Sequence, residues 1–242
     1  MNKFISKQSV AIWYALTALL ATFLVGQVIL WFFPDGSSMG TSLLFILMNL
    51  IPLIVAAVFS LVLSEVNSLG EFFKKVFLQK ENSLSWILAF FIPVIYYGIS
   101  ILLMNVRFTG NSLLAFFLYF PWTLLYGGLE EVGWRWFLQD HQMMLLSIVW
   151  FLWHIPIYQL PWITAGSSNY LIFYLMILGN TFLFGALKEY SKGAVPCILA
   201  HMLIDSLAVL MLVQSSLPQI ILLVIFEILV ASWLVAARKS EK

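Results

Sequence analysis

The segment Leu129–Arg135, which reads Leu-Glu-Glu-Val-Gly-Trp-Arg, places two adjacent carboxylates and a guanidinium in a strongly apolar chain. A charge at the centre of a membrane costs roughly 2.5–3.5 kcal/mol on insertion scales, so charges in such segments usually mark function. Glu131 and Arg135 stand four residues apart and can form an ion pair on one helix face. Adjacent residues of a regular helix point about 100° apart. Glu130 is therefore expected to face elsewhere, without a local partner and with a different role.

Two histidines and an aspartate in other apolar segments complete the candidate site. These are His154, His201 and, four residues after the second histidine, Asp205. Amide hydrolysis needs an activated water and stabilisation of the charge that develops on the tetrahedral intermediate. Glu130 is the candidate general base toward water, and each histidine could share that water or donate to the oxyanion. We expect these side chains to meet in a polar pocket within the membrane.

The composition indicates a membrane protein. The chain has 242 residues, of which 62% are hydrophobic and 10% charged, whereas a soluble domain is nearer a quarter charged. The formal net charge is +1 and the basic residues are scattered, so membrane lipids are expected partners and nucleic acid is not. The lone cysteine, Cys197, excludes an internal disulfide and a four-cysteine metal site. We predict an all-α polytopic membrane protein with a single transmembrane domain over residues 1–242.

Apolar runs long enough to span a membrane, at about 20 residues each, recur about eight times. They cover roughly residues 10–33, 41–64, 83–105, 112–135, 143–163, 170–187, 194–214 and 219–237. Between the second and third runs, residues 69–77 are expected to form a helix that lies in the membrane interface.

Lysines and arginines predict the orientation, because they accumulate in cytoplasmic loops. With the N-terminus in the cytoplasm, all of the 12 lysines and arginines except Arg107 fall on the cytoplasmic side. This predicts that both termini are cytoplasmic, and the small size and sparse loops favour a bacterial plasma membrane. At ~1.5 Å per residue, His154 should lie about 16 Å and His201 about 10 Å from the cytoplasmic face. The pocket is therefore expected in the inner half of the membrane or near its midplane, and reachable from the inner leaflet.

Three short motifs occur in order on separate runs: Glu130-Glu131-x-x-x-Arg135, Trp150-x-x-x-His154 and His201-x-x-x-Asp205. In these motifs the stretch from about 110 to 215 resembles the CPBP family. That family comprises the CAAX proteases and bacteriocin-processing enzymes, also called Abi proteins, and includes the prenyl-protein endopeptidases. The resemblance implies an intramembrane endopeptidase with eight spans, in which Glu130 is the principal catalytic residue.

Two positions depart from the family pattern. The family commonly has phenylalanine where this chain has Trp150, which keeps a large aromatic wall, and often has asparagine where this chain has Asp205. Ionised aspartate only accepts hydrogen bonds. Asp205 must therefore either hold a proton or serve to orient His201.

Zinc is the competing chemistry for the same side chains. Two histidines and a carboxylate are a common catalytic zinc set with water in the fourth position, and Glu130, His154 and His201 would be the ligands. The chain has no His-Glu-x-x-His motif. The family that the chain resembles has been described both as metallopeptidases and as metal-independent glutamate peptidases. We favour the glutamate mechanism without a cofactor, and zinc stays open.

The function expected from this resemblance is hydrolysis of a peptide bond near the cytoplasmic membrane face. The substrate would be a peptide or a lipidated protein, and the role would be peptide maturation or bacteriocin self-immunity. One alternative is a non-catalytic immunity or scaffold protein. Another is a small transporter, which would be expected to show inverted repeats or paired broken helices. Two acidic or histidine positions are given structural roles: Glu227 is expected to form a buried pair or an interhelical hydrogen bond, and His141, beside Asp140, is expected to be solvated.

Overall fold

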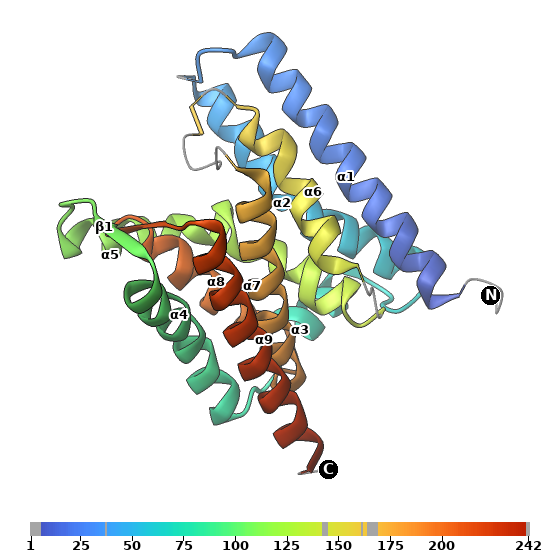
Figure 1. Cartoon of the computed structure of the whole chain (residues 1–242). Helices are drawn as coiled ribbons and strands as arrows, with labels where there is room; N and C mark the ends of the chain where they lie inside the picture. Colours follow the sequence, from blue (N-terminus) through green and yellow to red (C-terminus); the bar gives the residue numbers. More distant parts are fainter. Residues whose placement is uncertain (1–5, 37, 142–144, 161, 164–168, 241–242) are drawn as a thin grey trace.

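Several long helices begin at serine or asparagine caps. The computed structural model describes residues 6–36, 38–141, 145–160, 162–163 and 169–240. Helices α1 (Lys7–Phe32), α2 (Met39–Val62), α4 (Ser83–Leu103) and α7 (Tyr170–Tyr190) each follow a Ser or Asn whose side chain accepts a hydrogen bond from a backbone N–H of the first turn. Such a cap contributes about 1 kcal/mol to helix stability. The polar residue before each of these apolar runs therefore fixes where the helix starts (Figure 1).

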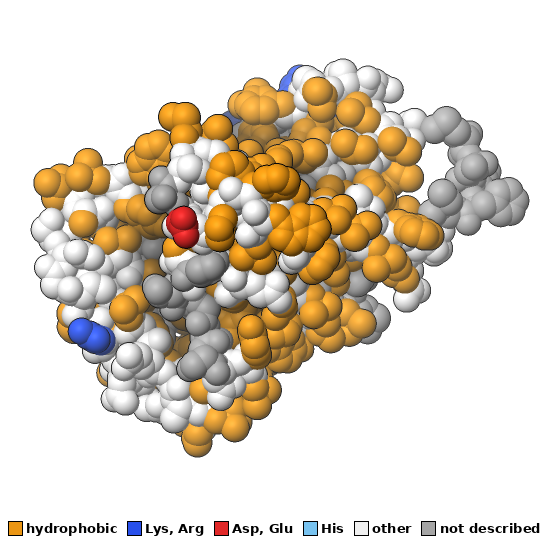
Figure 2. Space-filling model, turned by 90° about the horizontal axis from the view of Figure 1, so that it is seen from above, with side chains coloured by type: hydrophobic (Ala, Val, Ile, Leu, Met, Phe, Trp, Pro, Cys, Tyr) orange, Lys and Arg blue, Asp and Glu red, His pale blue; other side chains and the backbone are white. Residues whose placement is uncertain are grey.

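Within the described residues, six helical segments are long and apolar enough to cross a membrane. They are α1, α2, α4, α7, α9 (Leu217–Ser240) and the composite segment Leu113–Leu138. Figure 2 shows a face of the molecule that is covered largely by hydrophobic side chains and carries very few charges. These features mark the chain as a multi-pass integral membrane protein.

Two further apolar helices are shorter. Helices α6 (Leu146–Tyr158) and α8 (Val195–Leu207) have 13 residues each, which is about 20 Å at ~1.5 Å per residue. A bilayer has a hydrocarbon core of about 30 Å. Each of the eight apolar runs does contain a helix, but only six are full-length by this measure, so eight spans stays a prediction.

The composite segment is not a regular helix. Helix α5 (Leu113–Tyr126) ends at Gly127, whose backbone is non-helical (φ −171°, ψ −52°). A single 3₁₀ turn, η1 (Gly128–Glu130), and a π-helix, η2 (Val132–Leu138), follow it. π-helical turns are rare and are frequent at functional sites. The break falls on the two adjacent glutamates, so the regular helix geometry assumed for them from the sequence was wrong.

Two short strands add a β-ribbon to the helices. Strand β1 (Asn105–Phe108) pairs antiparallel with β2 (Met211–Gln214). The apolar run 194–214 was expected to be one helix, and this is wrong beyond Leu207, where α8 ends. Hydrophobicity alone does not distinguish a short apolar strand from the continuation of a helix.

The helix ends gather at two ends of the molecule, and one of them carries most of the charge. We call this charged end the basic end, and we define it by Lys7, Lys74, Lys188 and Arg238. Several contacts join the loops and helix ends at the basic end to one another. Glu65 Oε1 lies 3.0 Å from His141 Nε2, Asn82 donates to the Tyr190 carbonyl at 3.0 Å, and the Arg238 guanidinium lies over the Tyr190 ring.

The other end, called the opposite end, is defined by the α1–α2 connection, the β-ribbon and the residues after α6. Gln219 at the start of α9 donates to the Leu103 carbonyl at the end of α4 at 2.7 Å. Gly36 packs against Trp162. Since α1 begins and α9 finishes at the basic end, both ends of the described chain lie on the same side (Figure 1).

The segment 69–77 forms a helix as expected, α3 (Leu69–Phe77), at the basic end. It buries Phe72 and Val76 and exposes Leu69 and Phe73. Its placement in a membrane interface stays a prediction.

Two polar residues near the basic end differ from expectation. Arg135 was counted with the loop charges that set the orientation, but it is completely buried in an ion pair. The remaining basic residues still segregate in the same way. His141 was expected to be solvated and is instead buried, with Nδ1 2.6 Å from the Phe137 carbonyl and Nε2 bonded to Glu65. His141 thereby joins the segment after η2 to Glu65, just beyond the end of α2.

Candidate active site

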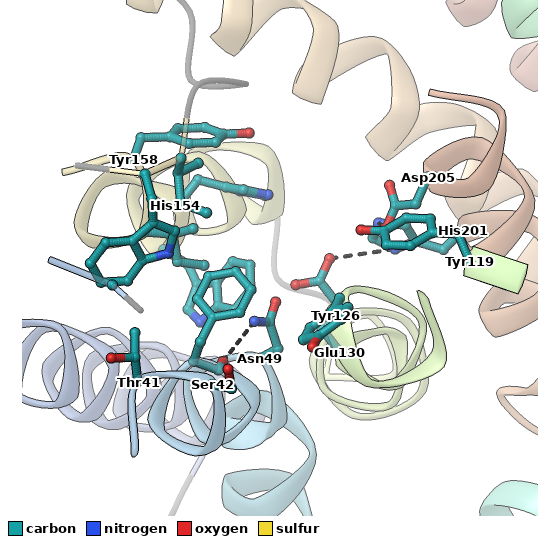
Figure 3. A pocket seen from close by; sticks show the side chains of 16 residues that line it. Thr41, Ser42, Asn49, Tyr119, Tyr126, Glu130, His154, Tyr158, His201 and Asp205 are labelled. Carbon is teal, nitrogen blue, oxygen red and sulfur yellow. Dashed lines mark hydrogen bonds and ion pairs between the residues drawn. The ribbon is translucent and has the colours of Figure 1, made fainter. Parts of the chain in front are cut away.

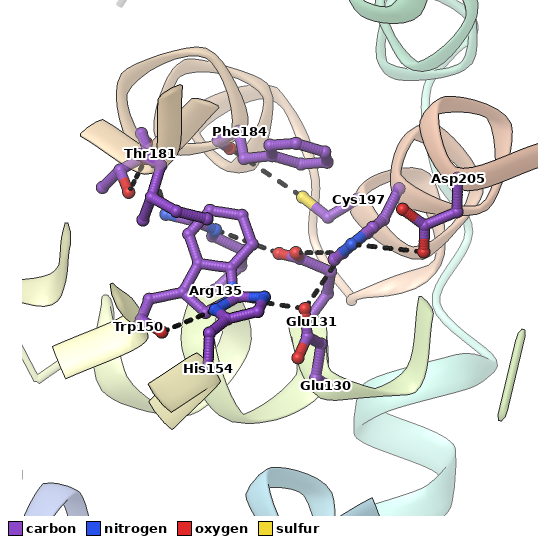
Figure 4. A network of polar contacts seen from close by, with 11 residues as sticks. Glu130, Glu131, Arg135, Trp150, His154, Thr181, Phe184, Cys197 and Asp205 are labelled. Atoms are coloured by element: carbon purple, nitrogen blue, oxygen red, sulfur yellow. Dashed lines mark hydrogen bonds and ion pairs between the residues drawn. The ribbon is translucent and has the colours of Figure 1, made fainter. Parts of the chain in front are cut away.

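Glu131 is the centre of the buried polar cluster. Its Oε2 lies 3.0 Å from Arg135 Nε, and its Oε1 lies 2.7 Å from His201 Nδ1 (Figure 4). Arg135 also donates to the Thr181 carbonyl at 3.2 Å. The predicted pair of Glu131 with Arg135 is confirmed. The contact with His201 was not predicted, and it ties α8 to the broken helix.

Glu130 keeps one oxygen available. Its Oε1 accepts a hydrogen bond from Trp150 Nε1 at 3.2 Å and lies 3.4 Å from His201 Nδ1. Its Oε2 is buried and has no hydrogen-bond partner within 3.5 Å among the described residues, although the Trp134 indole, which also lacks such a partner, approaches the same carboxyl group. An unpaired buried carboxylate oxygen costs free energy, so its retention points to a role toward a bound molecule or water.

The two glutamates therefore both approach His201 Nδ1. The expectation that the two glutamates face apart was wrong, and the backbone between them is not a regular helix. Glu130 makes its contacts with Trp150 of α6 and His201 of α8, not with a residue of its own helix. The two glutamates still differ in one respect. Glu130 lines the cavity described below, and Glu131 does not.

Gly127 and Gly128 allow this close approach of α8. A Cβ at Gly127 would collide with the Asp205 carboxylate, and one at Gly128 would lie 2.8 Å from Met202 Cγ. His201 Nε2 lies 3.6 Å from Asp205 Oδ2, within the range of an ion pair but beyond a good hydrogen bond. Asp205 thus faces His201 as expected, and the glycines before the glutamates are required for its position.

His154 stands across the cavity from Glu130 (Figure 3). Its Nδ1 lies 2.8 Å from the Trp150 carbonyl. A carbonyl only accepts, so Nδ1 carries the proton, and in the neutral ring Nε2 is an acceptor. Neutral His154 is therefore suited to share a water with Glu130 rather than to donate to an oxyanion.

The four residues Glu130, His154, His201 and Asp205 line one cavity of about 420 Å³. This is the convergence that the sequence predicted. The cavity walls also include residues that the sequence did not single out: Thr41, Ser42, Asn49, Tyr119, Tyr126 and Tyr158. Asn49 is the most informative of them, because it is buried and its Nδ2 donates to the Phe45 carbonyl at 2.8 Å. Its second N–H remains for a bound group.

Trp150 was expected to be an aromatic wall, and the structure gives it a polar role as well. Its indole donates to Glu130, its carbonyl accepts from His154, and the Arg135 guanidinium lies 4.8 Å from its ring centroid. Its position one helical turn before His154 was the available signal, since residues four apart share a helix face.

The residues that could hold a metal differ from the predicted set. Ligand atoms of Glu130, Glu131 and His201 lie within 4.8 Å of one another, whereas the predicted set was Glu130, His154 and His201. The donor types suit a divalent cation. Both Glu131 oxygens and His201 Nδ1 are already engaged, however, with Arg135 and with each other. A cation would have to replace these contacts, so the cluster as built does not fit one without rearrangement.

Glu227 lies outside the cavity. It is completely buried in α9, packs against Gly179 of α7, and neither of its oxygens bonds to another described residue. Its burial is confirmed, but the expected pair or interhelical hydrogen bond is wrong for the described part of the chain, where neither oxygen has such a partner.

The fold and the site thus define a multi-pass membrane protein with a buried carboxylate–histidine cluster at the base of a cavity. No protein-family model matches the chain, and no curated protein matches it in sequence.

Proposed function

We propose that this protein is an intramembrane peptidase of the glutamate type. In the proposal α6 and α8 complete eight membrane segments, and both termini are cytoplasmic. The substrate is a peptide or a lipidated protein. The biological role is peptide maturation or bacteriocin self-immunity. The observation that carries it is the free Oε2 of Glu130, at the base of a cavity that His154, His201 and Asp205 also line.

Glu130 acts as the general base in this proposal. A water bound between its Oε2 and the acceptor Nε2 of His154 would lose a proton to Glu130 as it attacks the peptide carbonyl carbon. Proton transfer to a positioned side chain contributes typically 10²–10⁴-fold to a rate. The same proton would then pass to the leaving amine, which restores the carboxylate.

The charge on the tetrahedral intermediate needs a donor on the cavity wall. Asn49 offers its second amide N–H, since its first is taken by the Phe45 carbonyl. Loss of a single such donor typically costs 10²–10³-fold in rate. His201 has a different role. Because carboxylates face both of its ring nitrogens, it holds Glu130, Glu131 and Asp205 in one arrangement.

The deciding experiment replaces the base without changing its shape. Membrane peptides from cells that produce the wild-type protein or Glu130→Gln are compared by mass spectrometry. We expect cleavage products of the wild type to disappear in Glu130→Gln and to persist in Glu227→Gln, which alters an equally buried acid away from the cavity. Products that persist unchanged in Glu130→Gln would remove the peptidase proposal.

The second candidate is a non-catalytic immunity or scaffold protein. It is supported by the saturation of Glu131, whose contacts with Arg135 and His201 also explain the cluster as an interhelical bond. Under this function a Glu130→Gln protein would keep its protective phenotype at normal expression.

A further inference from the structure

The cavity that Glu130 lines extends from the cluster toward one end of the molecule. Two other cavities touch the cluster but are not lined by Glu130: one of about 110 Å³ beside His154 and His201, and one of about 620 Å³ that reaches Arg135 from the basic end. The base of the cavity that Glu130 lines holds Glu130 and His201, and its outer part is lined by Gly36, Ser42 and Trp162, which belong to the opposite end. Along α2, Asn49 lies ten residues after the first residue of the helix, which is about 15 Å at ~1.5 Å per residue. No described residue of the basic end lines it. Figure 3 shows Thr41, Ser42 and Asn49 of α2 along one wall, with His154 and Tyr158 of α6 beside them.

The described lining of the cavity contains acidic side chains but no lysine or arginine. The acidic side chains are Glu130 and Asp205, and the histidines are His154 and His201. His201 is held between carboxylates, which offset a charge on its ring. The rest of the wall consists of aromatic rings, hydroxyls and the Asn49 amide. Such a wall accepts an extended peptide through its backbone and its apolar side chains, and it disfavours a negative charge.

We infer that the cavity admits an uncharged or cationic peptide segment from the outer, extracytoplasmic side of the membrane, and that it rejects a segment ending in a free carboxylate. The inference rests on the proposed peptidase function for the nature of the occupant. It rests on the segregation of basic residues for the side, because the lysine- and arginine-rich end of a membrane protein faces the cytoplasm. It departs from the expectation of access from the inner leaflet.

A carboxyl-terminal substrate shows why the charge matters. Its terminal carboxylate would enter a cavity of about 420 Å³ that already holds two acidic side chains, and like charges repel where the effective dielectric is low. An internal segment of a peptide brings no such charge. The cavity therefore favours a membrane-associated leader or precursor peptide, cleaved at an internal bond on the outer side.

Thiol labelling tests the side of access independently of cleavage. Cys197 is buried and is the only cysteine, so the full chain with Cys197→Ala provides a background for single cysteines. Ser42→Cys places a thiol on the exposed, outer part of the lining, and Lys74→Cys places one on α3 at the basic end. Intact bacterial cells are treated with a membrane-impermeant maleimide, before and after permeabilisation.

We expect Ser42→Cys to be labelled in intact cells and Lys74→Cys only after permeabilisation. Labelling of Lys74→Cys but not Ser42→Cys in intact cells would overturn the inference, and so would a Ser42→Cys that stays unlabelled in both states. Neither result depends on catalysis. A correct side with no cleavage products would therefore count against the peptidase function and leave the route of access standing.

The charge preference is tested with two impermeant thiol reagents of similar size, a trimethylammonium and a sulfonate methanethiosulfonate. Ser112→Cys, an exposed site before α5 at the opposite end, serves as the matched control. We expect the ratio of cationic to anionic reaction rates to be about tenfold higher at Ser42→Cys than at Ser112→Cys, as an acidic cavity attracts cations. Equal ratios, or a preference for the sulfonate, would refute the charge selection.

Discussion

Trp150 contacts Glu130 through its indole N–H, His154 through its carbonyl and Arg135 through its ring. Replacement by phenylalanine keeps a ring against Arg135 and removes the hydrogen bond to Glu130. A hydrogen bond to a charged group is worth about 1.5–3 kcal/mol, so we expect Trp150→Phe to lower turnover about tenfold or more. The measurement is the rate of product formation from the substrate found by peptide mass spectrometry. Unchanged turnover with a normal melting temperature would show that the indole serves packing only.

Arg135 should matter for stability more than for chemistry. It is completely buried with Glu131, and removing one partner of a buried ion pair typically costs about 3–5 kcal/mol because the other charge is left uncompensated. We expect Arg135→Met to lower the thermal unfolding temperature in detergent clearly.

The control for this prediction is the double variant Glu131→Gln/Arg135→Met, which removes both charges. It should regain a part of the loss. If the single variant is as stable as the wild type, Glu131 is held by His201 without need of Arg135.

At this scale the sequence predicted a local ion pair and the residues of a shared cavity, and it missed a contact between two helices. The pair of Glu131 with Arg135 follows from a spacing of four residues, and the structure confirms it. The contact of Glu131 with His201 could not be predicted, because it depends on how α8 docks against the break at Gly127. The convergence of Glu130, His154 and His201 was predicted from motif order, and the structure places all three in the lining of one cavity.

Among the helices, Gly179 of α7 packs directly against Glu227 of α9. A Cβ at Gly179 would collide with the Glu227 carboxylate, and overpacking in a core typically costs about 1–3 kcal/mol. We expect Gly179→Ala to destabilise the protein by that amount in detergent unfolding. In a Glu227→Ala background the same substitution should cost little, since the colliding group is gone. An equal cost in both backgrounds would place the collision elsewhere.

The number of helices was predicted better than the lengths of the individual helices. Apolar runs indicated the centres of all the long helices, because about 20 apolar residues are a strong signal. They did not indicate the ends of α6 and α8 or the strand β2, where the chain stays apolar while the backbone changes direction. The 3₁₀ and π turns of 128–138 were also missed, since no residue type specifies them.

For the molecule as a whole, the contact between Glu65 and His141 joins the end of α2 to the end of η2 and makes stability depend on pH. Burial lowers the pKa of His141, but its hydrogen bonds with Glu65 and the Phe137 carbonyl, together with nearby Asp140, raise the pKa above the ordinary 6.5. Protonated His141 therefore stabilises the fold fully below about pH 6.5, and this stabilisation is lost as the pH rises through the higher folded value.

The variant Glu65→Gln tests this dependence. We expect the difference in melting temperature between wild type and variant to be largest at mildly acidic pH and to shrink as the medium becomes alkaline. Lys7 lines the same small cavity as His141. A difference that does not vary with pH would show that the contact is not charged.

The membrane orientation is the whole-molecule property that the sequence predicts most directly. The segregation of basic residues remains after Arg135 is set aside as a buried ion-pair partner, because the other basic residues still gather near α3 and the two chain ends. The position of the cavity relative to that charge could not be predicted, since it depends on where α6 ends.

The shortness of α6 and α8 has a consequence for the surrounding lipid. Both helices begin at the basic end and finish after 13 residues, so they fall about 10 Å short of a typical hydrocarbon core on the other side. Hydrophobic mismatch of this kind is met by a local thinning of the bilayer. The acyl chains of one leaflet would then dip toward the tip of α6, which exposes Ile148 and Leu152, whereas α8 has no exposed residue and is shielded from lipid by other helices. Bilayers assembled from shorter-chain phospholipids should accommodate the molecule with less deformation than those from longer chains.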